Sequence, residues 1–195
     1  ETLIMFSLQK LRRYKNLVQL KLSYISQKDT IFDYFTKTQS VFIHIPKTAG
    51  KSVGKSIYGE HIGWGHYTWK EIVFVIGKKK YNNYFKFAFV RNPYDRVLSA
   101  YNFLKNGGIS ELDALFQEKV LSKFVDFEDF IHNGLGRRDV MSMFHFMPQT
   151  IFIFNKNGQL MVDFIGRFEN LENDYLKIKN RVSGKELMSL NRRRS

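Results

Sequence analysis

The hydrophobic pattern of the chain predicts short strands that alternate with helices. Two continuous hydrophobic runs, one opening at Val41 and one over Phe85 to Val90, have the β-branched and aromatic content of buried strands. Apolar residues at helical spacing follow both runs, and a further helical pattern covers Thr2 to Tyr24. We therefore predict an α/β fold with a short, mostly parallel sheet flanked by helices.

Capping and turn residues predict the remaining elements. Capping boxes precede two predicted helices, at Thr68-x-x-Glu71 and at Ser110-x-x-Asp113. Ile151 to Phe154 and Leu160 to Ile165 are predicted to pair as a hairpin around the turn Asn155-Lys156-Asn157-Gly158. The other predictions are helices near Ile31 to Phe35, over Phe124 to His132 and over Glu169 to Asn180, a polar turn over Lys78 to Asn83, and a mobile basic loop over Gly134 to Arg138.

The chain has 195 residues, enough for one domain with a buried core. We divide it into an N-terminal helical segment with its connector, residues 1–40, and one domain over residues 41–195. The N-terminal helix is amphipathic and basic. Packing on the domain or on a second copy of the chain is the first interpretation, and a helix lying on a membrane surface is the alternative.

Charge and cysteine content narrow the classes of partner and site. The net charge of +13 favours an anionic partner, such as a nucleotide, a nucleic acid, an acidic glycan or an anionic membrane. The sequence has no cysteine, which excludes disulfides, thiolate metal sites and a cysteine nucleophile and suits a reducing cytoplasm. No hydrophobic run is long enough to cross a bilayer. We expect a cytoplasmic protein, with peripheral membrane contact as the alternative.

The stretch after the first predicted strand has the chemistry of a phosphate-binding loop. Pro46 ends the strand, and a short loop leads into a helix. Small residues let backbone N–H groups approach an anion, and the helix N-terminus adds partial positive charge. The candidate ligands of the anion are Lys47, Thr48, Ala49, Gly50, Lys51 and Ser52.

Two other interpretations of this stretch remain open. It could be an ordinary turn between a strand and a helix, with solvated lysines. It could also be a nucleoside-triphosphate loop, since Gly54-Lys55-Ser56 fits the second half of that motif and Asp163 could then bind magnesium. The first glycine of the motif would fall at Ala49, however, and the helix would have to begin after Gly54.

The second predicted strand ends in another set of anion-binding residues. Arg91 lies at the carboxyl end of this strand, where parallel sheets bind ligands. Arg96 and Ser99 are neighbours on one face of the helix that Pro93 opens. The alternative for these arginines is pairing with Asp95 or with a backbone carbonyl. Two phosphate sites on two strand ends suit a nucleoside bisphosphate.

Histidines supply the candidate proton acceptors. His66 lies in a glycine-rich loop just ahead of a helix, where it could act as a general base, or could simply be a surface or capping-loop residue. His145 is either a second base, a contact for the acceptor or a structural residue. Arg137 and Arg138 could contact an anionic acceptor or be solvated.

These residues carry a resemblance to a known family. His44-Ile45-Pro46-Lys47-Thr48-Ala49-Gly50-Lys51-Ser52 and Phe89-Val90-Arg91-Asn92-Pro93-Tyr94-Asp95-Arg96-Val97-Leu98-Ser99-Ala100-Tyr101 resemble motifs of the carbohydrate sulfotransferases, sulfotransferase family 2. The resemblance is to the bacterial branch related to heparan sulfate 2-O- and 6-O-sulfotransferases. His145-Phe146-Met147-Pro148-Gln149 and Phe164-Ile165-Gly166-Arg167-Phe168-Glu169-Asn170-Leu171 resemble two later family segments.

The resemblance implies a fold, a co-substrate and a role for each motif. The fold would be the three-layer core of P-loop nucleotide kinases, and the co-substrate 3′-phosphoadenosine-5′-phosphosulfate (PAPS), without a metal. Lys47 would bind the bridging oxygen and the sulfonate, and His66 would be the catalytic base. Thr48, Gly50 and Ser52 would hold the 5′-phosphate, and Arg91 and Ser99 the 3′-phosphate. Lys51 stands where the family commonly has Thr or Ser.

The resulting hypothesis is transfer of a sulfonyl group from PAPS to a hydroxyl of a glycan, with an anionic acceptor favoured by the charge. The alternatives are an ATP-dependent kinase or NTPase and a non-catalytic nucleic-acid-binding module; under the main hypothesis no nucleic acid is expected as a partner. Association of two copies is compatible with the sequence. The Arg192–Arg194 run stands where the family normally continues into more helix, which predicts a truncated domain or a disordered tail.

Overall fold

The computed structural model describes residues 2–59 and 65–182, with side chains from residue 11 onward. Its first half contains α1 (Thr2–Ile25), α2 (Ile31–Thr38), β1 (Ser40–Ile43), α3 (Gly50–Tyr58), α4 (Trp69–Ile76), α5 (Lys78–Asn83), β2 (Phe85–Val90) and α6 (Pro93–Lys105). The second half contains α7 (Glu111–Lys119), α8 (Phe127–Asp129), the π-helix Phe130–Gly134, α9 (Arg138–Ser142), α10 (Gln149–Ile153), β3 (Phe164–Arg167) and α11 (Leu171–Lys179). Short 3₁₀ turns cover Leu121–Lys123 and Phe168–Asn170.

The described strands form one parallel sheet in the order β1-β2-β3, with β2 in the centre. Ile43 pairs with Ala88 across the first ladder, and Phe89 pairs with Gly166 across the second. Because all three strands run in one direction, their carboxyl ends lie at the same edge. This arrangement confirms the predicted α/β fold with a short parallel sheet flanked by helices.

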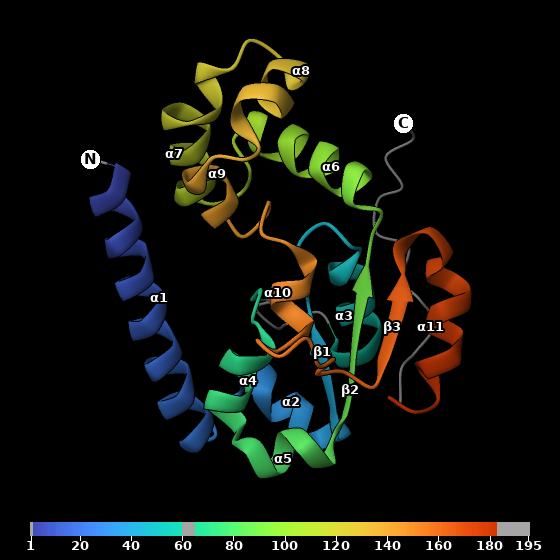
Figure 1. Cartoon of the computed structure of the whole chain (residues 1–195). Helices are drawn as coiled ribbons and strands as arrows, with labels where there is room; N and C mark the ends of the chain where they lie inside the picture. The colour runs from blue at the N-terminus through green and yellow to red at the C-terminus, as the bar shows by residue number, and fades with distance from the viewer. Residues whose placement is uncertain (1, 60–64, 183–195) are drawn as a thin grey trace.

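Hydrophobic side chains are buried in two separate clusters. The sheet cluster packs β1, β2 and their covering helices around residues such as Phe42, Phe87 and Phe152. The helical cluster lies among α6 to α9 and includes Leu104, Phe130 and other apolar residues away from the sheet. Figure 1 shows α6 to α9 gathered beyond the carboxyl ends of the strands, with α1 along one side of the molecule.

Several predicted elements differ from the structure. Lys78–Asn83 forms the helix α5 rather than a polar turn. Gly77 ends α4 and precedes α5, and the Tyr81 side chain of α5 is buried. The helix predicted over Phe124 to His132 begins at Phe127 and continues as the π-helix, which leaves Ile131 exposed. The predicted basic loop is a turn over residues 135–137, and its end residues Gly134 and Arg138 belong to the π-helix and to α9.

The predicted hairpin is also wrong in its strands. Gln149–Ile153 is the helix α10, and the predicted pairing survives only as one antiparallel bridge between Phe154 and Leu160. The turn itself forms, since the Asn155 N–H donates to the Gln159 carbonyl at 2.9 Å. Of the second run only Phe164 and Ile165 lie in a strand, β3, which pairs in parallel with β2 instead of with its neighbour in sequence. Short apolar runs fit a strand and a buried helix equally well, so the pattern alone could not separate them.

Candidate active site

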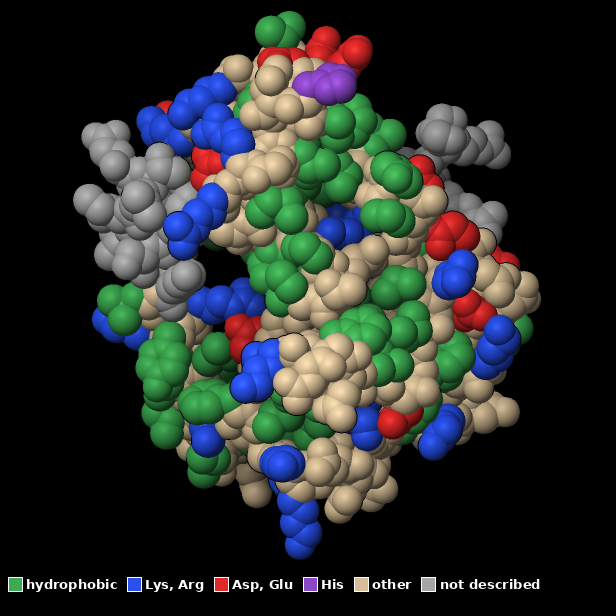
Figure 2. Space-filling model, in the orientation of Figure 1, with side chains coloured by type: hydrophobic (Ala, Val, Ile, Leu, Met, Phe, Trp, Pro, Cys, Tyr) green, Lys and Arg blue, Asp and Glu red, His purple; other side chains and the backbone are tan. Residues whose placement is uncertain are grey.

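The candidate site lies at the carboxyl edge of the sheet, between the two hydrophobic clusters. The loop after β1 carries Lys47, and Arg91 directly follows β2, the neighbouring strand. Figure 2 shows a hollow on this face with Lys or Arg side chains at its floor and hydrophobic side chains around it. The parallel sheet therefore brings together the two sets of residues that the sequence marks as anion binding.

The loop after β1 has an unusual backbone. Lys47 and Ala49 both have positive φ, 68° and 63°, in the left-handed region that non-glycine residues seldom adopt. Thr48 between them is fully buried, and its hydroxyl donates to the Ile45 carbonyl at 2.9 Å. This conformation directs the loop into α3, whose first N–H groups at Gly50 and Lys51 have no partner within the helix.

Gly50 is required by the close approach of a histidine ring. A Cβ at this position would lie 1.7 Å from Cδ2 of His44, which is far inside van der Waals contact. His44 is itself buried and packs against Phe42 at the end of β1. The sequence suggested that a small residue here admits an anion, and the structure adds a packing reason for it.

The lysines of the loop differ in placement. Lys47 is half-buried and its Nζ lies 4.1 Å from the centroid of the Phe103 ring on α6, a cation–π contact. Lys51 is exposed on the first turn of α3, while Ser52 in the same turn is buried. Lys47 therefore points from the loop toward the helical cluster, and Lys51 faces solvent.

Arg91 connects the two strand ends. Its guanidinium donates to the Lys47 carbonyl at 3.4 Å and lies 4.2 Å from the centroid of the Phe168 ring. Its Nε is buried and has no hydrogen-bond partner among the described residues. Ser99 lies half-buried on α6, and its hydroxyl has no hydrogen bond within the same part of the chain. Each of these two groups therefore has a hydrogen-bond donor that no described residue uses.

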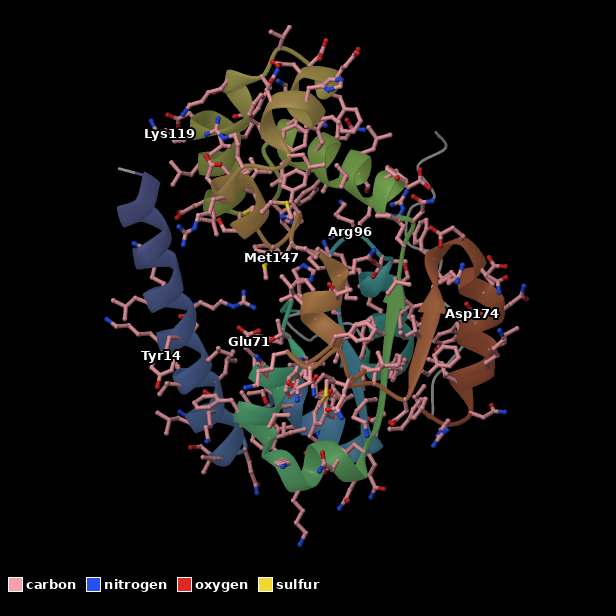
Figure 3. All side chains as sticks on the ribbon, viewed as in Figure 1. Tyr14, Glu71, Arg96, Lys119, Met147 and Asp174 are labelled. Carbon is pink, nitrogen blue, oxygen red and sulfur yellow. The ribbon has the colours of Figure 1, made fainter. Side chains whose placement is uncertain are left out.

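Arg96 has a structural role instead. It is only 3% exposed, and it donates to the carbonyls of His145 at 2.9 Å and Met147 at 2.6 Å. Burial lowers the pKa of Arg96 to about 10, so the guanidinium stays charged at neutral pH. Of the two interpretations of this arginine, pairing with backbone carbonyls is the one that the structure supports. Figure 3 labels Arg96 and Met147 on the facing segments.

Gln149 is a site residue that sequence reasoning missed. Its Nε2 donates to the Arg91 carbonyl at 2.8 Å, and its Oε1 accepts from the Arg91 N–H at 2.9 Å. The motif that contains His145 and Gln149 therefore holds the backbone at Arg91, while Arg96 holds the backbone of that motif in return. The sequence indicated this residue only through the presence of both family-like motifs in the same order. It did not predict that Gln149 contacts Arg91.

His66 is held in a defined tautomer. Its Nδ1 lies 3.0 Å from the backbone carbonyl of His44. Because a carbonyl only accepts hydrogen bonds, Nδ1 carries the proton and Nε2 keeps its lone pair. Burial lowers the pKa of His66 to about 4. The hydrogen bond to His44 acts in the opposite direction and raises this pKa, whereas the charge of Arg13 lowers it further. The imidazole is neutral at physiological pH, the form that can accept a proton.

His145 lies in a more enclosed position. It is 4% exposed, and its Nδ1 is 3.7 Å from Oδ1 of the buried Asp113, which is too far for a good hydrogen bond. Burial and the nearby His66 and Lys47 lower the pKa of His145 to about 3. Its ring contacts Phe103 on one side and Phe144 on the other.

A continuous arc of rings joins the candidate cation to the candidate base. Lys47 contacts Phe103, which contacts His145 with centroids 5.0 Å apart. His145 contacts Phe144 at 4.3 Å, and Phe144 contacts His66 at 5.2 Å. The arc therefore connects a primary ammonium at one end to a neutral imidazole, a proton acceptor, at the other.

The nucleoside-triphosphate interpretation is not supported by this geometry. The helix α3 begins at Gly50, so Gly54-Lys55-Ser56 lies inside it, and Ser56 is buried with its hydroxyl bonded to the Ser52 carbonyl. Asp163 precedes β3, at the opposite edge of the sheet from the loop, and pairs with Lys86 at 3.0 Å. The two parts of the motif therefore do not meet.

Other candidate groups were also located. Arg137 pairs with Asp139 at 2.6 Å, and Arg138 is exposed at the start of α9. In the part of the chain that the structure describes, no three His, Asp or Glu side chains are grouped to hold a metal ion. No described helix combines the length and apolar character needed to cross a bilayer. The Arg192–Arg194 run lies outside the described residues.

Comparisons with known proteins identify a family and a relative of this chain. The model of the sulfotransferase family matches residues 65–195, which include His66, Arg91 and Ser99 but not the loop after β1. An uncharacterized protein of Archaeoglobus fulgidus is 31% identical over 107 residues, covering 55% of this chain and 74% of that protein. No solved structure matches the chain.

Proposed function

The chain belongs to the sulfotransferase family, and from this premise we propose that it moves a sulfonyl group from PAPS to a hydroxyl of a glycan acceptor. The observation that carries the proposal is the arc of rings between Lys47 and His66, beside Arg91. Transfer between two oxygens needs a cation for the leaving group and a base for the attacking hydroxyl. The arc supplies both.

The proposed step is an in-line displacement at sulfur. The acceptor oxygen forms the new S–O bond while the bond from sulfur to the 5′-phosphate oxygen breaks. Nε2 of His66 takes the hydroxyl proton, and the departing electron pair stays on 3′-phosphoadenosine-5′-phosphate. Lys47 stabilises the negative charge that builds up on the leaving oxygen, and its low-dielectric, ring-lined position strengthens that effect.

The proposed 5′-phosphate site is the start of α3. The N–H groups of Gly50 and Lys51, the positive end of the helix and the Lys51 side chain all favour an anion there. The Thr48 hydroxyl is already bonded to Ile45, so we assign Thr48 and Ala49 a contribution through their backbone N–H groups. Ser52 is buried in the first turn and supports this end of the helix.

The proposed 3′-phosphate site is Arg91 with Ser99. The Nε of Arg91, which has no partner in the described part of the chain, and the half-buried Ser99 support this assignment. Gln149 and the Phe168 ring fix the backbone and the guanidinium of Arg91, so little ordering is needed on binding. A bisphosphate would then be held at both ends, from two neighbouring strands.

We propose that the acceptor is an anionic glycan. The formal net charge is +13. An open cavity of about 650 Å³ is lined by Thr68, Lys70, Thr150, Ile151, Phe154, Asn155, Lys156 and Gly158. Two ammonium groups with hydroxyl and amide side chains suit an acidic sugar chain.

The test is transfer of ³⁵S from labelled PAPS to a panel of neutral and acidic polysaccharides. The wild type is expected to label an acidic polysaccharide without added magnesium, and His66→Ala to lose about 10²-fold or more in rate. His145→Ala serves as the matched histidine control and is expected to lose less. Equal losses in the two variants, or labelling that requires ATP and magnesium, would contradict the proposed role of His66.

A further inference from the structure

The N-terminal helix α1 reaches the candidate site through one arginine. Arg13 donates from Nε to one oxygen of Glu71 at 2.5 Å and from a terminal nitrogen to the other at 2.8 Å. The same terminal nitrogen donates to the backbone carbonyl of His66 at 2.8 Å. In Figure 3 the label of Glu71, a residue of α4, lies on the side of α1 that faces the domain. The label of Tyr14, the next residue of α1 after Arg13, lies on the opposite side of this helix.

Glu71 also fixes the backbone that follows His66. Its Oε2 accepts from the Thr68 N–H at 2.7 Å and from the Thr68 hydroxyl at 2.9 Å, which is one half of the capping box of α4. One carboxylate therefore ties α1, the first turn of α4 and the two-residue link to His66 into one network. A bidentate arginine–carboxylate pair restricts orientation more strictly than a single bond.

His66 is consequently fixed at both ends. Arg13 holds its backbone carbonyl, and the His44 carbonyl holds its ring Nδ1. With the backbone and one ring nitrogen held, the direction of Nε2 is set. If this side chain rotated freely, Nε2 would not stay aligned with the hydroxyl proton that a general base must accept.

We propose that Arg13 is a positioning residue for His66, and that α1 is thereby part of the active site. The inference rests on the proposed role of His66 as the base. It concerns a segment that the family model does not cover, since that match begins at residue 65. Contacts across 53 and 58 positions of the sequence make it a tertiary feature, separate from the capping of α4.

Arg13 also acts on His66 through its charge. A cation beside the imidazole disfavours the imidazolium, so Arg13 lowers the pKa of His66. The other charged groups that act on this ring are Lys51 on α3, which lowers its pKa, and Asp113 on α7, which raises it. The rings of His44 and His145 also face it. Loss of the Arg13 charge should therefore raise the pKa of His66, and a lysine at this position, which keeps the charge, separates this effect from a loss of burial.

The experiment compares Arg13→Met, Arg13→Lys and Arg12→Met in the full chain. Arg12 is the neighbouring exposed arginine of α1 and is the matched control. For each protein, kcat and KM for PAPS are measured as functions of pH. Calorimetry measures the binding of 3′-phosphoadenosine-5′-phosphate, and thermal unfolding gives the midpoint temperature. Imidazole ¹⁵N NMR, with His66→Gln for assignment, reports the tautomer and pKa of His66 without requiring turnover.

Arg13→Met is expected to lower kcat about tenfold or more, to leave bisphosphate affinity within about twofold, and to raise the pKa of His66. Arg13→Lys should keep the pKa closer to that of the wild type but not restore kcat, because a lysine ammonium lacks the planar fork that holds Glu71 by two bonds. Arg12→Met should match the wild type.

Two results would overturn the inference: an unchanged pKa of His66 in Arg13→Met, or a rate loss that follows the melted fraction alone. If NMR shows the expected change while the wild type neither binds the bisphosphate nor transfers sulfonyl groups, the positioning of His66 stands and the proposed function fails.

Discussion

At the scale of single residues, the hydrogen bond from His66 Nδ1 to the His44 carbonyl has the largest chemical consequence. It leaves Nε2 as the proton acceptor, and burial keeps the ring neutral. The sequence marked His66 through its position before a capping box, but it could not give the tautomer, because His44 is 22 positions away and belongs to another element.

The pKa of His66 predicts the acid side of the pH profile. A base must be unprotonated, and the pKa of His66 is lowered to about 4. We expect kcat/KM for the acceptor to be flat from neutral pH down to about 5 and to fall by half near pH 4. Circular dichroism at each pH controls for unfolding. A half-point near 6.5, the ordinary value for histidine, would contradict the environment described here.

Lys47 is predicted to act on the rate more than on binding. Lys47→Ala removes the cation proposed to stabilise the leaving oxygen, so kcat is expected to fall by about 10²–10³-fold. The bisphosphate affinity should change much less. The control is Lys78→Ala, which removes an exposed lysine of α5, close to where the chain enters β2 at the other edge of the sheet. Weaker binding with an unchanged kcat would assign Lys47 to the phosphate site alone.

At the scale of elements, hydrophobic runs and capping residues correctly predicted those helices and strands whose form depends on neighbouring residues in the sequence. The strand β2 has the predicted limits Phe85 to Val90, and the capping box at Thr68 and Glu71 opens α4 as expected. The helix α10 was missed because its apolar run has no period of its own, and its form follows from packing in the sheet cluster. The position of β3 beside β2 likewise depends on a distant partner.

Gly166 offers a test of how β3 packs on β2. A Cβ at this glycine would lie 2.3 Å from a ring carbon of Phe89, its partner across the ladder. We expect Gly166→Ala to lower the free energy of unfolding by about 1–3 kcal/mol, the usual cost of overpacking. Urea denaturation measures the change, and Gly136→Ala, where a Cβ meets nothing within 4 Å, is the control. Equal stability of both variants would mean that the two strands are farther apart.

At the scale of the whole molecule, the site depends on contacts between segments that lie far apart in the sequence. Lys47 follows β1 and His66 precedes α4, whereas Phe103 lies on α6 and packs against the helical cluster. Arg96 and Gln149 tie the two motifs to each other, and these pairs span 49 to 58 positions. The sequence singled out the candidate residues, but not the contacts between them, because no local pattern encodes such long-range pairs.

The most direct test of the central claim is calorimetric binding of 3′-phosphoadenosine-5′-phosphate without magnesium, compared with ATP plus magnesium. The two phosphate sites at neighbouring strand ends predict micromolar binding of the bisphosphate and weaker binding of ATP. Arg91→Ala should weaken binding by about 2 kcal/mol or more, roughly 30-fold, since it removes a charged contact. Arg138→Ala, which removes an exposed arginine of α9, should leave it unchanged. No binding of the bisphosphate, or a preference for ATP with magnesium, would contradict the account.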